Sequence, residues 1–313
     1  MRLMLLWILV ATAAQAAPPE PAKFIEALSN GTVDPVKHDL VPEDFWTLSA
    51  EQRLAWNQSV VPGLLTEDLN SGCEADLLRR LNGLMWMSLL QKSTDAATWK
   101  SNAEAVRARL GEIEERLRRA AEQAPANDDP RIAELERRVA MDQKIRTLEE
   151  TPWSADLPPL AEEAWSSVMV VRFWAVDCDN TAWLKRQMAE IGWFDIERFG
   201  TGADKGAWLL VQHADRDKAF QREVLAMLES LPPGKTSSKN VAYLYDRVAN
   251  AEGRPQKYGT QGMCQPDGAW APNQIEDPAG VDARRKAIGL IPLAEYIAGF
   301  RNICPPPAPA SKS

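Results

Sequence analysis

The sequence predicts a mainly α-helical protein with a small β-hairpin near its C-terminus. Apolar residues recur at spacings of three and four through a long central segment, which is the period of one helix face. Two strand-like runs, Tyr258–Met263 and Ala269–Ile275, are joined through Pro266-Asp267-Gly268, a sequence typical of a turn. Most other segments are short and end at Pro or Gly, which indicates short helices.

The N-terminus has the features of a cleavable signal peptide. Arg2 is followed by an apolar run from Leu3 to Ala14, and Ala14-Gln15-Ala16 has the small residues that a signal peptidase requires. The run is shorter than the ~20 residues that a membrane-spanning helix needs. We therefore expect residues 1–16 to be removed and the protein to be periplasmic or secreted. The alternative is a retained membrane anchor, but flanks that would stop transfer are missing.

Charge and composition narrow the class of partner. The 313-residue chain carries a formal net charge of −8, with 36 basic and 44 acidic side chains. An acidic chain lacks the electrostatic footprint of a protein that binds nucleic acid or anionic membrane. We expect no nucleic-acid partner and no membrane span after signal cleavage, and we identify no cofactor motif.

Four cysteines follow the predicted cleavage site, an even number that suggests disulfides in an exported chain. Their spacing contains no Cys-x-x-Cys, which argues against a zinc ribbon or a thioredoxin-type site. Cys264 lies in the predicted hairpin and Cys304 at the end of the last helix, so we predict that they pair, and that Cys73 pairs with Cys178. Unpaired buried thiols are the alternative.

Residues 17–128 are predicted to form an N-terminal helical region. Ser49-Ala-Glu-Gln52 matches a capping box that opens a short helix. The clearest periodicity of the chain follows and ends before Pro125. It predicts one long amphipathic helix whose apolar stripe is Trp99, Ala103, Val106, Leu110, Ile113, Leu117, Ala120 and Ala124.

A second helix is expected to begin at Asp129-Pro130, because Pro is tolerated in the first turn. The short connection predicts an antiparallel helical hairpin, with a dimeric coiled coil as the alternative. The stripe of this second helix, set by Ile132, Leu135 and Val139, continues onto Asp142 and Arg146. Opposite charges four residues apart can pair, either on the surface or facing inward.

Residues 129–303 are predicted to form the C-terminal domain, and residues 304–313 a Pro-rich tail. Asp179 or Asn180 is expected to cap one helix and Asp217 another, while Asn240 opens a third. Two last helices should begin near Asp282 and Pro292. The apolar run from 207 to 214 fits either a buried helix or a strand.

The C-terminal half resembles an uncharacterised bacterial family, a domain of unknown function found in both exported and intracellular proteins. The resemblance covers roughly residues 134–300, and the family often has Pro where Phe194 stands here. The resemblance marks positions that belong to the family motifs, but it implies no chemistry, because the family has no assigned reaction. The matching pieces, in order, are Asp142-Gln143-x-x-Arg146, Asp177-x-x-Asn180, Gly192-Trp193, Trp208-Leu-Leu-Val-Gln-His213-Ala-Asp215, Phe220-Gln221, Tyr243-Leu244-x-Asp246-Arg247, Gln256-x-Tyr258-Gly259-Thr260-Gln261, Val281-Asp282-x-Arg284-Arg285 and Gly289-Leu290-x-Pro292-Leu293.

His213 is the one histidine in the family-like half, and it lies at the end of an apolar run. One interpretation makes it a core or capping residue, and the other makes it a general base oriented by Asp215 or Asp246. No Gly-x-Ser-x-Gly sequence and no His-Glu-x-x-His sequence occur, so we expect neither a serine-hydrolase elbow nor a zinc site. A harder cation, held by His213 and carboxylates, is a further alternative.

Polar residues on the family motifs are expected to converge on one site. Gln256, Tyr258, Thr260 and Gln261 lie in a Gly-containing loop whose hydrogen-bonding side chains are unusual for a core. Asp246-Arg247 would otherwise be an ordinary surface pair. The predicted ligand-binding set is Asp142, Arg146, Arg247, Gln256, Tyr258, Thr260 and Gln261, and the predicted catalytic pair is His213 and Asp246.

Two functions remain open on the sequence alone. The first is a module of the cell envelope that binds a polar small molecule or an envelope protein. The second is a hydrolase-like enzyme that uses His213 with Asp246 or Asp215. The first is slightly favoured, because no complete set of nucleophile, base and acid is readable.

Overall fold

The computed structural model describes residues 92–147, 156–301, 303 and 304, together with a few residues between 45 and 90. These residues form two compact units. The first contains the described residues up to 110, apart from Cys73, and residues 156–171. The second contains Cys73, residues 111–147 and the described residues from 172 onward. The predicted signal peptide and the tail beyond Cys304 lie outside the described residues.

Two long helices contribute residues to both units. They are α4 (Ala96–Glu122) and α6 (Pro159–Ile191). The predicted stripe of α4 is buried from Trp99 through Leu117, as the helical period requires. In the first unit, the Ser49 hydroxyl accepts from the Gln52 N–H and the Gln52 amide oxygen accepts from the Ser49 N–H, which is the predicted capping box.

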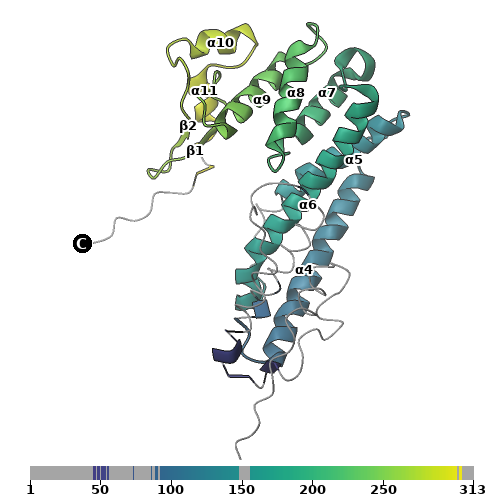
Figure 1. Ribbon diagram of the computed structural model, residues 1–313, viewed down its shortest axis with the longest axis vertical. Coiled ribbons are helices and arrows are strands. Elements are labelled where there is room, and N and C mark those ends of the chain that lie inside the picture. The colour runs from purple at the N-terminus through teal and green to yellow at the C-terminus, as the bar shows by residue number, and fades with distance from the viewer. Residues whose placement is uncertain are drawn as a thin grey trace, which may run out of the picture. The chain divides into compact units, whose positions relative to one another are not determined.

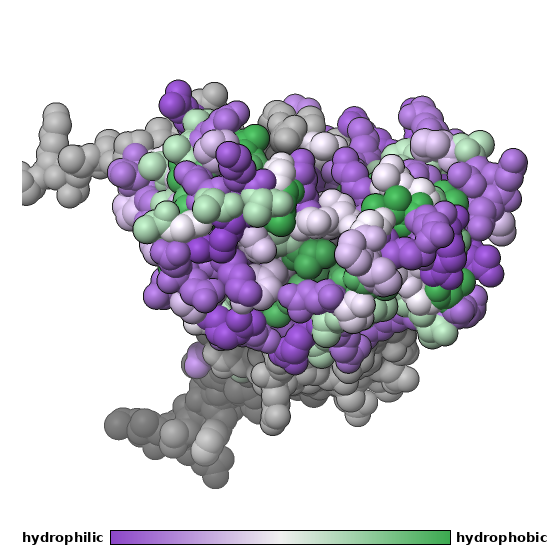
Figure 2. Space-filling model, turned by 90° about the horizontal axis from the view of Figure 1, so that it is seen from above, coloured by the Kyte–Doolittle hydropathy of each residue, from purple (hydrophilic) through white to green (hydrophobic). Residues whose placement is uncertain are grey.

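The second unit is built mainly from four further helices (Figure 1), which are α5 (Pro130–Thr147), α7 (Ile196–Gln212), α8 (Lys218–Ser230) and α9 (Ser238–Ala251). Helix α5 packs against α7, α8 packs against α9, and α7 contacts both α8 and α9. The core that these helices share with the end of α6 and the segment after it contains Leu135, Leu184, Phe194, Val224 and Leu244. The surface above this core is largely hydrophilic, with small hydrophobic patches (Figure 2).

The C-terminal part of the second unit contains the predicted β-hairpin. Strands β1 (Gly262–Cys264) and β2 (Trp270–Pro272) pair antiparallel, with Met263 opposite Ala271. The hairpin is followed by α10 (Val281–Ala287) and α11 (Leu293–Ala298), and α11 packs against β2 and α10. The mainly helical fold with a long helix pair and a small hairpin is therefore confirmed.

The second unit contains two disulfides, in the pairing that the sequence predicts. Cys73 bonds to Cys178 and Cys264 bonds to Cys304, with Cα separations of 5.1 and 5.4 Å. Both separations lie in the usual range for a disulfide. Disulfides are typical of proteins in an oxidising, extracytoplasmic compartment. Among the described helices, none is long and apolar enough to cross a membrane.

The structure decides four local predictions, of which two are wrong. Helix α6 runs through Asp179 and Asn180, so neither residue caps a new helix there. The apolar run after residue 206 is helical, as the end of α7. Asn240 lies inside α9, where its buried amide donates to Asp204 instead of capping the helix, and Ser237 is the cap residue. The Asp217 cap is confirmed, since its carboxylate accepts from the Phe220 N–H.

Candidate functional site

Helix α5 directs two charged side chains inward at the positions where its apolar stripe is interrupted. The side chain of Asp142 is fully buried and that of Arg146 is 27% exposed. One turn separates them, and Arg146 Nη2 lies 3.2 Å from Asp142 Oδ1. The inward-facing pair is thus the correct alternative of the two that the sequence left open. A buried carboxylate needs such partners, because an unpaired one would cost several kcal/mol.

Asp142 also holds the imidazole of His213. His213 is the residue at the C-terminal end of α7, and its Nδ1 lies 2.9 and 2.8 Å from the two carboxylate oxygens of Asp142. The imidazole remains 19% exposed. The carboxylate that orients His213 is therefore Asp142, and not Asp246 or Asp215 as predicted from the sequence.

The contacts of Nδ1 favour one of the two tautomers of His213. Arg146 Nε also lies 3.0 Å from His213 Nδ1, and Nδ1 cannot both accept from Arg146 and donate to Asp142. A lone pair on Nδ1 would face two carboxylate oxygens at less than 3 Å, which is repulsive, whereas an N–H makes a charge-assisted hydrogen bond. We therefore assign the proton to Nδ1, which leaves the lone pair on Nε2.

Asp177 completes the cluster from α6. Arg146 Nη2 donates to Asp177 Oδ1 at 2.6 Å, so one guanidinium nitrogen contacts both carboxylates. The pKa of Asp177 is raised to about 7, chiefly by burial and in smaller part by the negative charges of Asp142 and Asp215, against the opposing effect of Arg146. Asp177 can therefore exchange a proton near neutral pH.

The cluster contains the atoms of a possible cation site. Asp142, Asp177 and His213 each offer a ligand atom, and these atoms lie within 4.8 Å of one another. Arg146, however, donates to both carboxylates and places a positive charge among them. A cation would have to displace this guanidinium, so the contacts favour proton chemistry over metal binding.

Arg247 lies next to this cluster but has a different partner from the one predicted. Its Nη1 contacts both carboxylate oxygens of Asp215, at 2.7 and 2.9 Å, and its Nε donates to the side-chain oxygen of Gln212. Gln212 directly precedes His213 in the chain. Gln221 fixes the same turn by donating to Asp215 and to the Gln212 carbonyl oxygen. Arg247 therefore braces the segment that carries His213.

Asp246 has a different role from the predicted catalytic one. Its buried carboxylate accepts hydrogen bonds from the backbone N–H groups of Lys257, Tyr258 and Thr260 and from the Thr260 hydroxyl. These four donors occupy both oxygens. No described contact joins Asp246 to His213, so Asp246 is an anchor for the loop and the pairing with His213 is corrected to Asp142.

The loop 256–261 uses its polar side chains mainly on itself. Gln256 donates to the carbonyl oxygens of Gln261 and Asn273, and its side-chain oxygen accepts from the Gln261 N–H. Thr260 is committed to Asp246. The structure therefore separates the predicted set into the His213 cluster with its Arg247 brace and an anchored loop whose Tyr258 lines a separate pocket.

Asp177 is the member of the cluster that was not predicted from the sequence as a site residue. It stands in a motif of the resembled family, three residues before Asn180, and this position was the available signal. A cap at Asp179 or Asn180 would have ended the preceding segment close to Asp177. Because α6 is continuous, Asp177 instead lies one turn before Thr181, whose hydroxyl donates to the Asp177 carbonyl oxygen.

Comparison with known proteins gives a family and no reaction. No curated protein and no solved structure matches the chain. Residues 120–303, which are more than half of the chain and include every member of the cluster, match a family of unknown function, DUF6624. The chain therefore belongs to the DUF6624 family.

Proposed function

We propose that this protein is an exported, extracytoplasmic acid–base enzyme that acts on a polar substrate at the Asp142–Arg146–Asp177–His213 cluster. Export is supported by the signal-like residues 1–16 and by the two disulfides, which favour the periplasm or the exterior of the cell. Of the two functions that the sequence left open, the geometry favours the hydrolase-like enzyme over the binding module.

The contact between Asp142 and His213 Nδ1 carries this proposal. A buried carboxylate that holds Nδ1–H fixes the tautomer and orientation of the ring, and it stabilises the imidazolium that forms when Nε2 takes up a proton. His213 would then remove a proton from water or from a substrate hydroxyl. General base catalysis of this kind contributes roughly 10²–10⁴-fold to a rate.

The two other members of the cluster suit the same chemistry. Arg146 holds Asp142 and Asp177 in place and supplies the positive charge that keeps the buried carboxylates together. Asp177, with its pKa raised to about 7 by burial, can return a proton to a leaving group while His213 holds the one it removed. Stability of the fold does not require two groups that can exchange protons in one half-buried cluster, so their presence supports a catalytic role.

A substrate-class screen tests the proposal. Chromogenic esters, phosphodiesters, glycosides and peptide amides are incubated with the oxidised protein and with His213→Gln, Asp142→Asn and His38→Gln. His38 is the other histidine of the chain and provides a matched control. We expect one substrate class to be turned over by the wild type and His38→Gln, and at least about 100-fold more slowly by His213→Gln. Turnover that survives unchanged in His213→Gln contradicts the proposal.

A further inference from the structure

The loop 256–261 is held by two buried charges on separate helices. Asp246 of α9 binds its backbone N–H groups, as described above. Arg285 of α10 is also fully buried, and it donates to the carbonyl oxygens of Tyr258 and Ile291. Burying two charged groups is costly unless they are hydrogen-bonded, and here both are used to fix one short loop. The side chains that this loop presents outward are therefore held in place.

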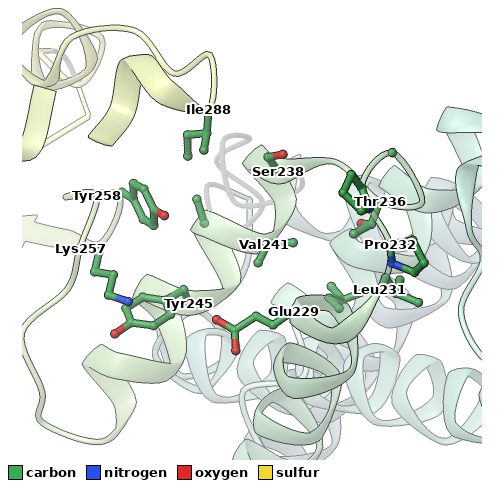
Figure 3. Close-up of a pocket in the computed structure, with 14 residues that line it drawn as sticks. Glu229, Leu231, Pro232, Thr236, Ser238, Val241, Tyr245, Lys257, Tyr258 and Ile288 are labelled. Carbon is green, nitrogen blue, oxygen red and sulfur yellow. The ribbon is translucent and has the colours of Figure 1, made fainter. Parts of the chain in front are cut away.

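Two of these side chains, Lys257 and Tyr258, line a pocket of about 410 Å³. Its volume lies within the roughly 300–1,000 Å³ that is typical of small-molecule sites. In Figure 3, Tyr258 and Ile288 face Leu231, Pro232 and Thr236 across the pocket. The remaining walls come from α8 and α9, so the pocket lies within the second unit.

The pocket combines an apolar floor with two aromatic walls. Val241 and Ile288 are among the aliphatic residues that line it, and the rings of Tyr245 and Tyr258 stand edge to face with centroids 6.5 Å apart. Burial raises the pKa of Tyr258, so its hydroxyl stays protonated and able to donate at neutral pH. Such walls suit an aliphatic or aromatic side chain of a ligand.

Opposite charges stand at the two sides of Tyr245. The ammonium of Lys257 lies 4.2 Å from the centroid of the Tyr245 ring, and the carboxylate of Glu229 reaches towards the same ring from α8 (Figure 3). In the part of the chain that the structure describes, the ammonium of Lys257 contacts the Tyr245 ring and forms no ion pair, and the carboxylate of Glu229 forms none either. Each charge is therefore available to a ligand.

We propose that this pocket binds a small zwitterion with an apolar side chain, namely an amino acid or a short peptide with a free ammonium and a free carboxylate. Lys257 would pair with the ligand carboxylate and Glu229 with the ligand ammonium, while the side chain enters between Tyr258 and Val241. A simple anion would leave Glu229 opposed to it, and a simple cation would leave Lys257 opposed. Only a ligand with both charges complements both sides.

Calorimetric titration of the oxidised full chain with L-leucyl-L-leucine tests this inference, with N-acetyl-leucyl-leucine and leucyl-leucine amide as ligands that each lack one charge. We expect saturable binding of the free dipeptide and a Kd at least about tenfold higher for each blocked form, which corresponds to about 1.4 kcal/mol. These comparisons leave the protein unchanged, so they do not depend on whether a variant folds.

Protein variants assign each charge. Acetylation of the ligand should weaken its binding to the wild type but cause no further loss in Glu229→Gln, because that variant lacks the partner of the ligand ammonium. Amidation of the ligand should likewise cause no further loss in Lys257→Met, because that variant lacks the partner of the ligand carboxylate. Glu223→Gln and Lys286→Met, which remove exposed charges outside the pocket, should bind as the wild type does. His213→Gln should also bind normally, which separates this site from the proposed enzyme. Absence of saturable dipeptide binding, or equal binding of the blocked forms, overturns the inference.

Discussion

His213 Nδ1 lies 2.8 Å from Oδ2 of Asp142, a carboxylate with no exposed surface. The two residues are 71 positions apart and come from α5 and the end of α7. The contact between these two helices therefore brings together an imidazole with an exposed edge and a buried group that can hold its proton. The cluster around this contact and the loop anchored by Asp246 are the two arrangements that mutation can probe most sharply.

Removal of the Asp142 carboxylate should destabilise the fold strongly. In Asp142→Ala, Arg146 loses one of its two carboxylates and His213 loses the acceptor of its Nδ1–H. Breaking a buried charged pair typically costs about 3–5 kcal/mol. Urea unfolding of the oxidised protein measures the change, with the exposed Glu190→Ala on α6 as the control, which should change stability by less than about 0.5 kcal/mol. Equal stability of the two variants would contradict a buried pair.

Asp177 should make the protein less stable as the pH rises. Burial raises its pKa in the folded state to about 7, above the usual value near 3.9, so the folded protein binds the proton more tightly than the unfolded chain does. The free energy of unfolding should then fall between about pH 4 and pH 7, by on the order of 2–4 kcal/mol from this group.

The variant Asp177→Asn tests that dependence. It cannot ionise, so the part of the slope between about pH 4 and pH 7 that comes from Asp177 should disappear. Urea unfolding at several pH values gives the two profiles, and Asp179→Asn, an exposed neighbour on the same helix, provides the control. Parallel profiles for the wild type and Asp177→Asn would show that the carboxyl is not perturbed.

Gly259, the one glycine of the anchored loop, should be harder to replace than Gly253, which precedes the loop. It has φ +68°, and an added Cβ would lie 2.9 Å from Leu293 Cδ1 and 3.0 Å from Ile275 Cδ1. Gly253 has the same φ but no atom within 4 Å of an added Cβ. Gly253→Ala therefore measures the cost of the backbone conformation alone, about 1–2 kcal/mol. Gly259→Ala should cost roughly 1–3 kcal/mol more, from overpacking, when both are compared by thermal unfolding. Equal losses would contradict the packing around the loop.

Export should remove the first sixteen residues. Ala14-Gln15-Ala16 has the small-residue spacing that signal peptidase requires, so the mature chain should begin at Ala17. Intact mass of the protein isolated from the periplasm or the medium measures this directly. Replacement of Ala16 by a bulky residue should block or shift the cleavage, and a wild-type mass that retains residues 1–16 would contradict the prediction.

Local periodicity is sufficient to predict much of the fold. The stripe from Trp99 to Leu117 identifies α4, and the interruption of the next stripe at Asp142 and Arg146 marks half of the cluster from the sequence alone. The turn at Pro266-Asp267-Gly268 identifies the hairpin because Gly268 adopts φ +81°, which few other residues tolerate.

The partners of these residues cannot be read in the same way. A carboxylate that pairs with a distant imidazole leaves no periodic trace, so His213 has several candidate carboxylates in the sequence and the fold selects Asp142. Asp246 accepts backbone N–H groups from a loop eleven or more residues later, and backbone donors carry no sequence identity. Asp177 lies within a long helix rich in apolar residues, where one acidic residue is consistent with a cap, an exposed position or a site.

The tautomer of His213 tests the central claim most directly. Long-range ¹H–¹⁵N correlation spectra of the two imidazoles, assigned with His38→Gln and His213→Gln, report which ring nitrogen carries the proton when the ring is neutral. An acid–base centre oriented by Asp142 predicts a protonated Nδ1 and an unprotonated Nε2 for His213, and Asp142→Asn should remove this preference. A neutral His213 protonated on Nε2, with Nδ1 accepting from Arg146, would contradict the account.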